Sequence, residues 1–214
     1  MKSYLIRPAG ALVLALALAS CGGGDDDKFT VAGSVGGLLY PGLVLQNNGG
    51  QDLTLNPPAN ATDRVNFAFP NKIEYGEVYN VSIKTQPAHQ TCGADPDVAD
   101  GRTDTAGRLA SIDVRLMCYI NTAAVGGTIT GLTEANTGLV LTNGSNTGTY
   151  TPSLDAIKAA KPFRYDLPVK VPYGVTYGVT VLTQPVGRFC TVVNATGTMG
   201  DNAVTNVDVN CVPV

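Results

Sequence analysis

The chain has 214 residues, and only 14% of them are charged, well below the quarter that is usual for soluble domains. The formal net charge of −3 argues against the basic face that nucleic-acid binding needs, so we expect no nucleic-acid partner. A single histidine argues against a histidine-rich metal site or a catalytic triad, and the 25 glycines and 13 prolines favour turns over long helices.

The first 20 residues have the features of an export signal. Lys2 and Arg7 form a short basic start, and residues 9–19 form an apolar run of 11 residues. This run is too short to span a bilayer as a helix, which takes about 20 residues, but it has the length of the apolar region of a secretory signal. The sequence therefore predicts a signal peptide over residues 1–20.

The end of the apolar run, Leu18-Ala19-Ser20-Cys21, resembles the lipobox of bacterial lipoproteins. In that family the cysteine thiol carries a diacylglyceryl group, the signal is cut just before the cysteine, and the new amino terminus is acylated. The resemblance implies that Cys21 is the lipidated first residue of the mature chain, anchored to a membrane that the chain does not span. The alternative is an ordinary signal peptide with an incidental cysteine.

Residues 21–28 are the lipidated cysteine followed by three glycines, three aspartates and a lysine. We expect this segment to be a tether, and a flexible coil of seven residues spans about 15 Å root-mean-square. In bacterial lipoproteins an aspartate directly after the cysteine is typical of retention in the inner membrane. Gly22 stands at that place, which favours the outer membrane of a bacterial cell envelope, with the face of the membrane left open.

The remainder of the chain contains two copies of one module. Residues 75–87 (YGEVYNVSIKTQP) and 173–185 (YGVTYGVTVLTQP) agree at seven of thirteen positions, where unrelated segments would share about one. Two cysteines stand at matching places in each copy. We expect a first module over residues 29–118, a linker over residues 119–124 that is too short for wide independent motion, and a second module over residues 125–214.

Both copies carry the pattern of β-strands. Around Tyr79 and again around Tyr177, apolar side chains alternate with polar ones, as in a strand with one buried face. Further strands are predicted at residues 65–69, 112–118, 163–167 and 205–211. Residues 153–161, between a serine cap and a proline, are the one predicted helix. Short strands separated by glycine- and asparagine-rich turns predict an all-β fold of two tandem β-sandwich modules.

The phrase Gly-x-x-Tyr-x-Val, which begins at Gly76 and again at Gly174, resembles the tyrosine corner of immunoglobulin-like and fibronectin-like sandwiches. In that corner the hydroxyl bonds to backbone a few residues upstream, so the resemblance implies structural roles for Tyr79 and Tyr177. The repeat as a whole resembles modules found in tandem in bacterial envelope lipoproteins of unassigned function. That resemblance implies an immunoglobulin-like fold and an envelope location, and it implies no activity.

Five is an odd number, so one cysteine would stay unpaired in an oxidising compartment. The count becomes even if Cys21 takes the lipid and the other four form disulfides. The simplest pairing lies within each module, Cys92 with Cys118 and Cys190 with Cys211, because the chain is a repeat with two cysteines at matching places in each copy. Exported proteins are usually oxidised, which favours disulfides. Bridges between the modules and a metal site are the alternatives. Zinc favours closely spaced ligands such as Cys-x-x-Cys, and the sequence has none.

Two features remain as candidates for chemistry. His89 has no catalytic motif around it, so we interpret it as a surface histidine. An acid-rich loop is a weak calcium candidate, because its spacing departs from that of an EF-hand and the second copy lacks it; its carboxylates are Asp95, Asp97, Asp100 and Asp104. A solvated loop is the plainer interpretation. We expect no catalytic residues and no cofactor.

The sequence therefore predicts a membrane-anchored envelope lipoprotein with a non-catalytic structural or binding role, whose loops and strand edges contact a protein partner. The alternative is a surface adhesin or glycan-binding lipoprotein, with calcium at the acidic loop or exposed aromatic side chains on one face. The candidates for such a face are Tyr40, Tyr119, Tyr150 and Tyr173. A hydrolase would need a deep pocket that holds His89 beside a serine or an acid.

Overall fold

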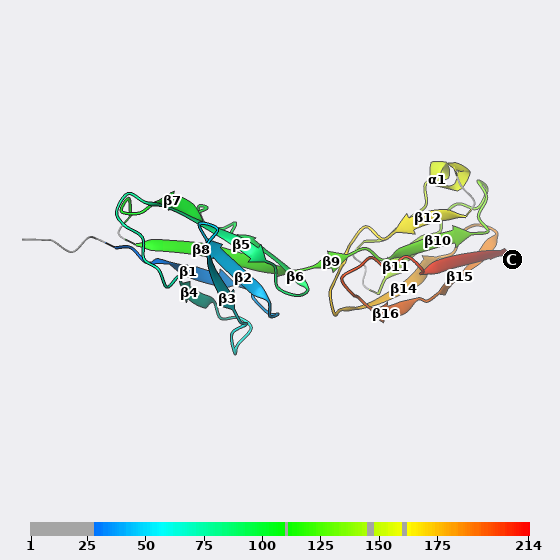
Figure 1. Cartoon of the computed structure of the whole chain (residues 1–214). Coiled ribbons are helices and arrows are strands. Elements are labelled where there is room, and N and C mark those ends of the chain that lie inside the picture. Colours follow the sequence, from blue (N-terminus) through cyan, green and yellow to red (C-terminus); the bar gives the residue numbers. More distant parts are fainter. Residues whose placement is uncertain (1–27, 110, 145–147, 160–161) are drawn as a thin grey trace, which may run out of the picture.

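The computed structural model describes residues 28–109, 111–144, 148–159 and 162–214, which form two modules arranged end to end (Figure 1). The predicted signal peptide, Cys21 and the tether up to residue 27 lie outside the described residues. Within the described part of the chain, no helix is long and apolar enough to cross a membrane. The prediction of an all-β fold with two sandwich modules is confirmed.

Module 1 consists of two four-stranded sheets that enclose one apolar core. The first sheet has the order β4 (Val65–Ala68), β1 (Val31–Gly36), β8 (Ile112–Ile120) and β6 (Gln90–Ala94). The second sheet has the order β3 (Gln51–Leu55), β2 (Leu43–Asn47), β5 (Val78–Thr85) and β7 (Thr103–Thr105). Along β8, alternate residues from Ile112 to Cys118 are buried, as the period of two predicts.

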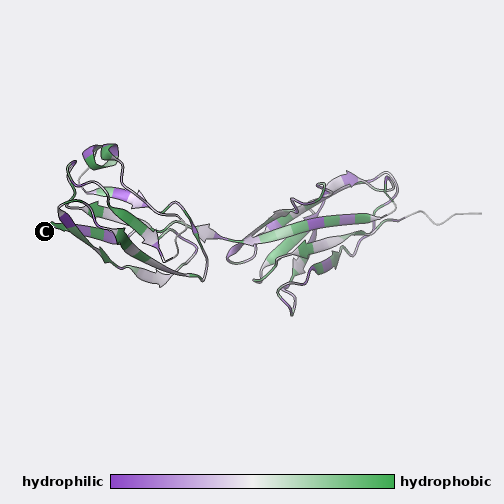
Figure 2. Ribbon diagram, turned by 180° about the vertical axis from the view of Figure 1, so that it is seen from behind, coloured by the Kyte–Doolittle hydropathy of each residue, from purple (hydrophilic) through white to green (hydrophobic). Residues whose placement is uncertain are grey.

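Module 2 repeats this arrangement around a separate core. Its first sheet has the order β12 (Phe163–Asp166), β10 (Gly126–Thr130), β17 (Asp208–Pro213) and β15 (Arg188–Val193). Its second sheet has three strands, β11 (Val140–Asn143), β14 (Thr176–Thr183) and β16 (Thr196–Thr198). A short pair, β9 (Thr122–Ala123) and β13 (Val171–Pro172), lies at the end that faces module 1 (Figure 1). Figure 2 shows the alternation of hydrophobic and hydrophilic residues along these strands.

The predicted helix is present and belongs to module 2 alone. Helix α1 (Leu154–Ala159) begins after Ser153, whose hydroxyl accepts a hydrogen bond from the Ala156 amide at 3.1 Å and so caps the helix. In module 1 the corresponding region of the chain forms β3, which pairs with β2 along five residues. In module 2, Tyr150 forms a single bridge to Leu141 beside β11.

The first and last strands of each module run parallel to each other, in close contact. β1 pairs with β8, and β10 pairs with β17. A Cβ atom added at Gly33 would collide with the Val114 carbonyl, and one at Gly127 would collide with the Val207 carbonyl. Glycine at these matching positions therefore permits the parallel pairing. In the constant-type immunoglobulin arrangement the first strand pairs with the second, so these modules share the sandwich architecture with a strand order of their own.

Both predicted disulfides are present, and each joins two neighbouring strands of one sheet. Cys92 on β6 pairs directly with Cys118 on β8, and Cys190 on β15 pairs directly with Cys211 on β17. All four cysteines are buried, so they point inward as the strand phase of Cys118 and Cys211 predicts. The antibody disulfide instead connects the two sheets. Here each disulfide holds an edge strand onto its own sheet.

The two tyrosines assigned to a corner are buried, but the corner hydrogen bond is absent. Among the described residues, the hydroxyls of Tyr79 and Tyr177 donate no hydrogen bond to backbone upstream. The buried hydroxyl of Tyr165 on β12 donates instead to the Val207 carbonyl at 2.8 Å, 42 residues further along the chain. Burial raises the pKa of the Tyr165 hydroxyl, and the nearby Asp208 carboxylate adds to the shift.

Candidate functional site

The junction between the two modules contains a cluster of side chains that the sequence did not reveal. We call the end of module 1 that faces module 2 its tip, formed by residues 38–42, 86–90 and 119–121. The facing end of module 2, its base, is formed by the turn around Tyr173 and the loop around Asp201. The cluster consists of Tyr40 and His89 from the tip and Tyr173 and Asp201 from the base.

His89 makes two contacts with module 2. Its imidazole stacks on the ring of Tyr173, with centroids 3.6 Å apart and planes 7° apart. Its Nδ1 lies 2.7 Å from Oδ2 of Asp201, and because a carboxylate can only accept, the Nδ1–H is the donor. The side chain of His89, interpreted from the sequence as a surface histidine, is 29% exposed, and it also contacts module 2. His89 joins the two modules, although it lies more than eighty positions before Tyr173 and Asp201 in the sequence.

Tyr40 completes the cluster from the loop after β1. Its ring meets His89 edge to face, with centroids 5.1 Å apart, and meets Tyr173 in the same way at 5.8 Å. Edge-to-face contacts of this kind direct the positive rim of one ring at the negative face of another. The imidazole of His89 is thus packed against two phenol rings and hydrogen-bonded to a carboxylate.

Asn121 connects the same elements through hydrogen bonds of its backbone. Its amide donates to the His89 carbonyl at 2.9 Å, and its carbonyl accepts from the Tyr173 amide at 2.9 Å. Its side-chain oxygen accepts from the Thr91 hydroxyl at 2.8 Å. The next residues, β9, pair with β13 of module 2. The expected linker is thus hydrogen-bonded to both modules.

A histidine beside an aspartate is two-thirds of a hydrolytic triad, but the junction lacks the rest. A triad needs a hydroxyl or thiol within hydrogen-bond reach of the imidazole. In the described part of the chain, the imidazole of His89 forms no hydrogen bond with a serine or cysteine. The arrangement can hold two modules in a fixed relation.

The acidic loop contains carboxylates that are already paired with cations. Asp95 is buried, and its Oδ2 accepts from Nη1 of Arg64 at 3.1 Å. The same guanidinium also donates to the Ser34 hydroxyl at 2.9 Å and to the Leu116 carbonyl at 3.0 Å. The other oxygen of Asp95 accepts the backbone amide of Asp97 at 3.2 Å. Asp95 therefore fixes the loop to the first sheet.

The two later carboxylates of the loop face different arginines. Asp100 accepts two hydrogen bonds from Arg102, at 2.9 and 2.7 Å, and these bonds lower the pKa of Asp100. Asp104 pairs with Arg108 at 2.9 Å. Among the described residues, no three histidine, cysteine or acidic side chains lie together as metal ligands would. The structure does not gather the four calcium candidates into one site.

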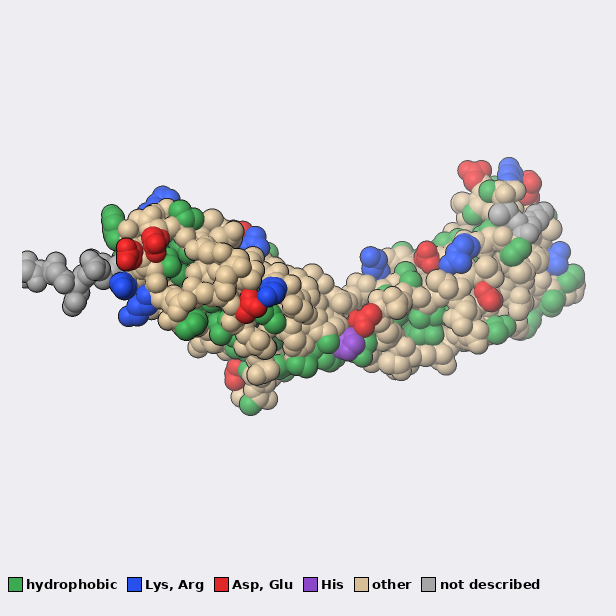
Figure 3. All heavy atoms as spheres, in the orientation of Figure 1, with side chains coloured by type: hydrophobic (Ala, Val, Ile, Leu, Met, Phe, Trp, Pro, Cys, Tyr) green, Lys and Arg blue, Asp and Glu red, His purple; other side chains and the backbone are tan. Residues whose placement is uncertain are grey.

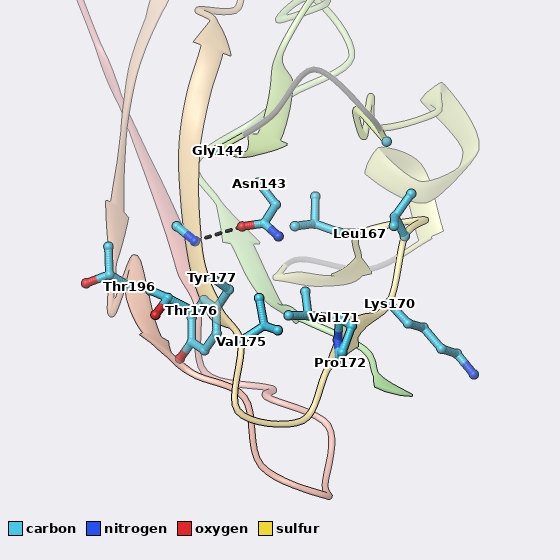
Figure 4. A pocket seen from close by; sticks show the side chains of 13 residues that line it. Asn143, Gly144, Leu167, Lys170, Val171, Pro172, Val175, Thr176, Tyr177 and Thr196 are labelled. Carbon is cyan, nitrogen blue, oxygen red and sulfur yellow. Dashed lines mark hydrogen bonds between the residues drawn. The ribbon is translucent and has the colours of Figure 1, made fainter. Parts of the chain in front are cut away.

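Module 2 contains a largely apolar pocket of about 460 Å³, between the end of β11, the start of β14 and the segment before β13 (Figure 4). Leu167 and Val171 line one side and Tyr177 another, while Asn143 accepts a hydrogen bond from the Gly178 amide at 2.7 Å. The lining residues include no histidine and no acid. His89 lies in module 1, so this pocket does not provide the site that a hydrolase would need.

The tyrosines proposed for glycan stacking are not gathered on one exposed face. Tyr40 and Tyr173 pack against each other in the junction, and Tyr150 packs against Tyr165 with centroids 5.3 Å apart. Tyr119 is exposed.

The sequence reasoning missed the junction because its four residues come from distant segments. One usable signal was that His89 has a glycine as its counterpart in the second copy, beside otherwise matching residues.

Comparison with known proteins gives no family for this chain. No family model matches the sequence, and no curated protein matches it. Among solved structures, the chain is similar to the TIE protein of Bacillus anthracis, with 13% sequence identity and a TM-score of 0.44. The match covers 87% of this chain and 34% of that chain, so this chain spans about a third of the length of that protein.

Proposed function

We propose that the protein is a lipid-anchored spacer of the bacterial cell envelope, with a non-catalytic binding role at the end farthest from the membrane. The observation that carries this proposal is the junction at His89 and Tyr173, which joins the modules in line. The described chain begins, in blue before β1, at one end of the molecule, and the C-terminus lies at the other (Figure 1). A chain anchored through Cys21 would therefore present module 2 away from the membrane.

The contacts of the junction favour a fixed arrangement of the two modules. Aromatic pairs contribute about 0.5–1.5 kcal/mol each, and a hydrogen bond contributes about 1 kcal/mol. The pair of His89 and Asp201 is partly exposed, so it adds at most about 1 kcal/mol. Such a junction makes a spacer of defined length.

The experiment that tests the anchor compares three full-length chains in a bacterial host, each with an epitope after Val214. Wild type and Ser20→Gly, which keeps a small residue before the cysteine, should sediment with the membranes. Cys21→Ser should be recovered in the soluble fraction, because three acyl chains are lost. A Cys21→Ser chain that remains in the membrane fraction would show that the anchor is proposed at the wrong residue.

The side of the membrane is tested with the same tagged wild-type chain. Protease is added to intact cells and to cells with a permeabilised outer membrane, with a periplasmic protein as the control. Cleavage in intact cells places the modules outside and favours capture of an external partner. Cleavage only after permeabilising places them in the periplasm and favours a structural role within the envelope.

A further inference from the structure

The base of module 1 lies at the end of the molecule where the described chain begins (Figure 1). We define it by the segments that match the base of module 2, which are the turn at residues 73–77 and the loop at residues 105–109, together with Phe29. Phe29 belongs to this end because it pairs with Ile73 through two backbone hydrogen bonds, at 2.7 and 2.9 Å. Figure 3 shows hydrophobic side chains beside charges of both signs at this end of the molecule.

The two bases share one backbone geometry. Tyr75 matches Tyr173 in the repeat, and each is followed by a glycine with positive φ. The amide of this glycine donates to the Ala106 carbonyl at 3.0 Å in module 1 and to the Met199 carbonyl at 2.9 Å in module 2. In the junction, Tyr173 is half-buried against the tip of module 1, whereas Tyr75 is 72% exposed. The turn that carries the docking tyrosine of module 2 is thus present in module 1 with its ring open to the surroundings.

The base of module 1 gathers apolar side chains around this ring. The ring of Tyr75 lies against Gly107, and its centroid is 6.5 Å from that of the Phe29 ring. Leu109 follows two residues after Gly107 and is 64% exposed. Counted without a gap from the two carbonyls that accept from the turn glycines, Leu109 holds the place of Asn202. The base at the outer end thus has leucine where the base in the junction has an amide side chain.

The charges of this base balance one another. Arg108 is paired with Asp104 at 2.9 Å. The other charged residues of the defined base and of its first described neighbours are two cations and two anions, all exposed: Lys28, Lys72, Glu74 and Glu77. A surface with equal numbers of both signs exerts little net attraction on a charged partner. Any contact of this base therefore depends on its apolar side chains.

The length of the chain before the base decides which surface lies nearest to it. Lys28 is seven residues after Cys21, and seven residues reach at most about 25 Å when fully extended. In a chain anchored through Cys21, the base therefore always lies within about 25 Å of the lipid-bearing residue. A link this short gives the base a local concentration on the order of millimolar at the bilayer surface, so a weak contact is sufficient.

We propose that the base of module 1 rests on the lipid bilayer that holds Cys21, with Tyr75 and Leu109 in the headgroup layer. Tyrosine is enriched at this depth because its ring is apolar and its hydroxyl is polar, and the layer is about 5–8 Å thick on each side of the hydrocarbon. Exposed apolar residues that lie together are typical of such a contact. The inference rests on the proposed anchor at Cys21.

The contact gives the anchored chain a direction. A lipid on Cys21 alone fixes the position of module 1 and leaves its tilt free. A base seated on the bilayer holds module 1 upright, because the base and the tip lie at opposite ends of the module (Figure 1). The junction at His89 and Tyr173 then carries module 2 away from the membrane.

The test uses the chain from Cys21 to Val214 with both disulfides formed, which leaves Cys21 as its free thiol. This thiol is coupled to a maleimide-bearing phospholipid in phosphatidylcholine vesicles, which supplies an anchor at the expected position. The sequence has no tryptophan, so Tyr75→Trp adds a single fluorescent reporter. In vesicles with brominated acyl chains we expect its fluorescence to fall about twofold, because an indole at the interface lies next to the upper part of these chains.

Tyr119→Trp is the matched control, since Tyr119 is exposed at the tip of module 1, and its fluorescence should not change with brominated lipid. Leu109→Asn, which copies the residue of module 2, should remove most of the quenching when it is added to Tyr75→Trp. Val186→Asn, at an exposed valine of module 2, should leave the quenching unchanged. Circular dichroism checks that each variant is folded, as expected for exposed positions.

Equal quenching of the Tyr75→Trp and Tyr119→Trp chains overturns the proposal. Salt at about 1 M should leave the quenching of the Tyr75→Trp chain unchanged, and a loss of quenching in salt would show a contact held by charge and overturn the apolar contact. The anchor in this test is made by coupling, so the result does not depend on lipid modification in a cell. A wrongly assigned anchor appears in the fractionation of Cys21→Ser, and a wrongly assigned contact appears here.

Discussion

The imidazole of His89 lies parallel to the phenol ring of Tyr173, with centroids 3.6 Å apart, although the two residues belong to different modules. Each residue is held in place by its own module, His89 by a turn with positive φ and Tyr173 by the turn before β14. The contact therefore forms only when the two modules are docked against each other. Removing it should change the shape of the molecule far more than its stability.

His89→Gly tests this directly, because glycine is the natural residue at the matching turn of module 2 and accepts the positive φ. We expect the thermal midpoint to stay within a few degrees of wild type, since both cores are intact. Small-angle scattering should show a broader distribution of distances between the modules. Tyr119→Ser, at an exposed residue of the same tip that is not part of the cluster, is the control and should leave the scattering unchanged.

Gly33→Ala should unfold module 1 or weaken it severely. The added methyl group would collide with the backbone of Val114 on the neighbouring parallel strand, and backbone cannot move aside as a flexible side chain can. We expect a loss of about 3 kcal/mol or more in the free energy of unfolding, measured with urea. Gly93→Ala on β6 is the control, because a Cβ there meets no atom within 4 Å, and it should change stability by about 0.5 kcal/mol at most. Equal effects of the two changes would refute the steric argument.

Replacing Cys92 and Cys118 together by alanine should destabilise module 1 and spare module 2. The two cysteines are 26 residues apart, so the chain-entropy model gives a loss of about 3.5 kcal/mol. The modules have separate cores, which predicts two transitions in calorimetry, of which only one moves. The corresponding double change at Cys190 and Cys211 should move the other transition. A shift of both transitions by either change would mean that the modules unfold together.

Asp208 should make module 2 sensitive to acid. The hydroxyl and the amide of Thr128 donate to Asp208 at 2.7 and 2.9 Å, and these bonds lower the pKa of the carboxyl below its usual range. Because the pKa is lower in the folded state, the stabilisation is fully present above the ordinary aspartate pKa of about 4 and is lost as the pH falls through the folded value. Thermal midpoints measured from pH 6 down to pH 2 should fall less steeply for Asp208→Asn than for wild type. Parallel curves would contradict the assignment.

Much of the fold could be predicted because it depends on local patterns. The period of two around Tyr79 and Tyr177, the matched segments at 75–87 and 173–185, and an even count of cysteines after Cys21 all act over short stretches or by simple counting. The cap at Ser153 is local as well, and helix α1 begins directly after it. These features require no knowledge of which strand lies beside which.

The junction, the strand order and the pairing of the acidic loop were decided by tertiary structure. His89 meets Tyr173 and Asp201 only after two sandwiches have folded, and Asp95 meets Arg64 only when β8 lies beside β1. The matching turns around His89 and Gly187 share one backbone geometry, yet the first contacts module 2 whereas Val186 in the second is exposed. Contacts between residues far apart in the chain depend on the closure of long loops and on steric fit, and neither leaves a periodic signal in the sequence.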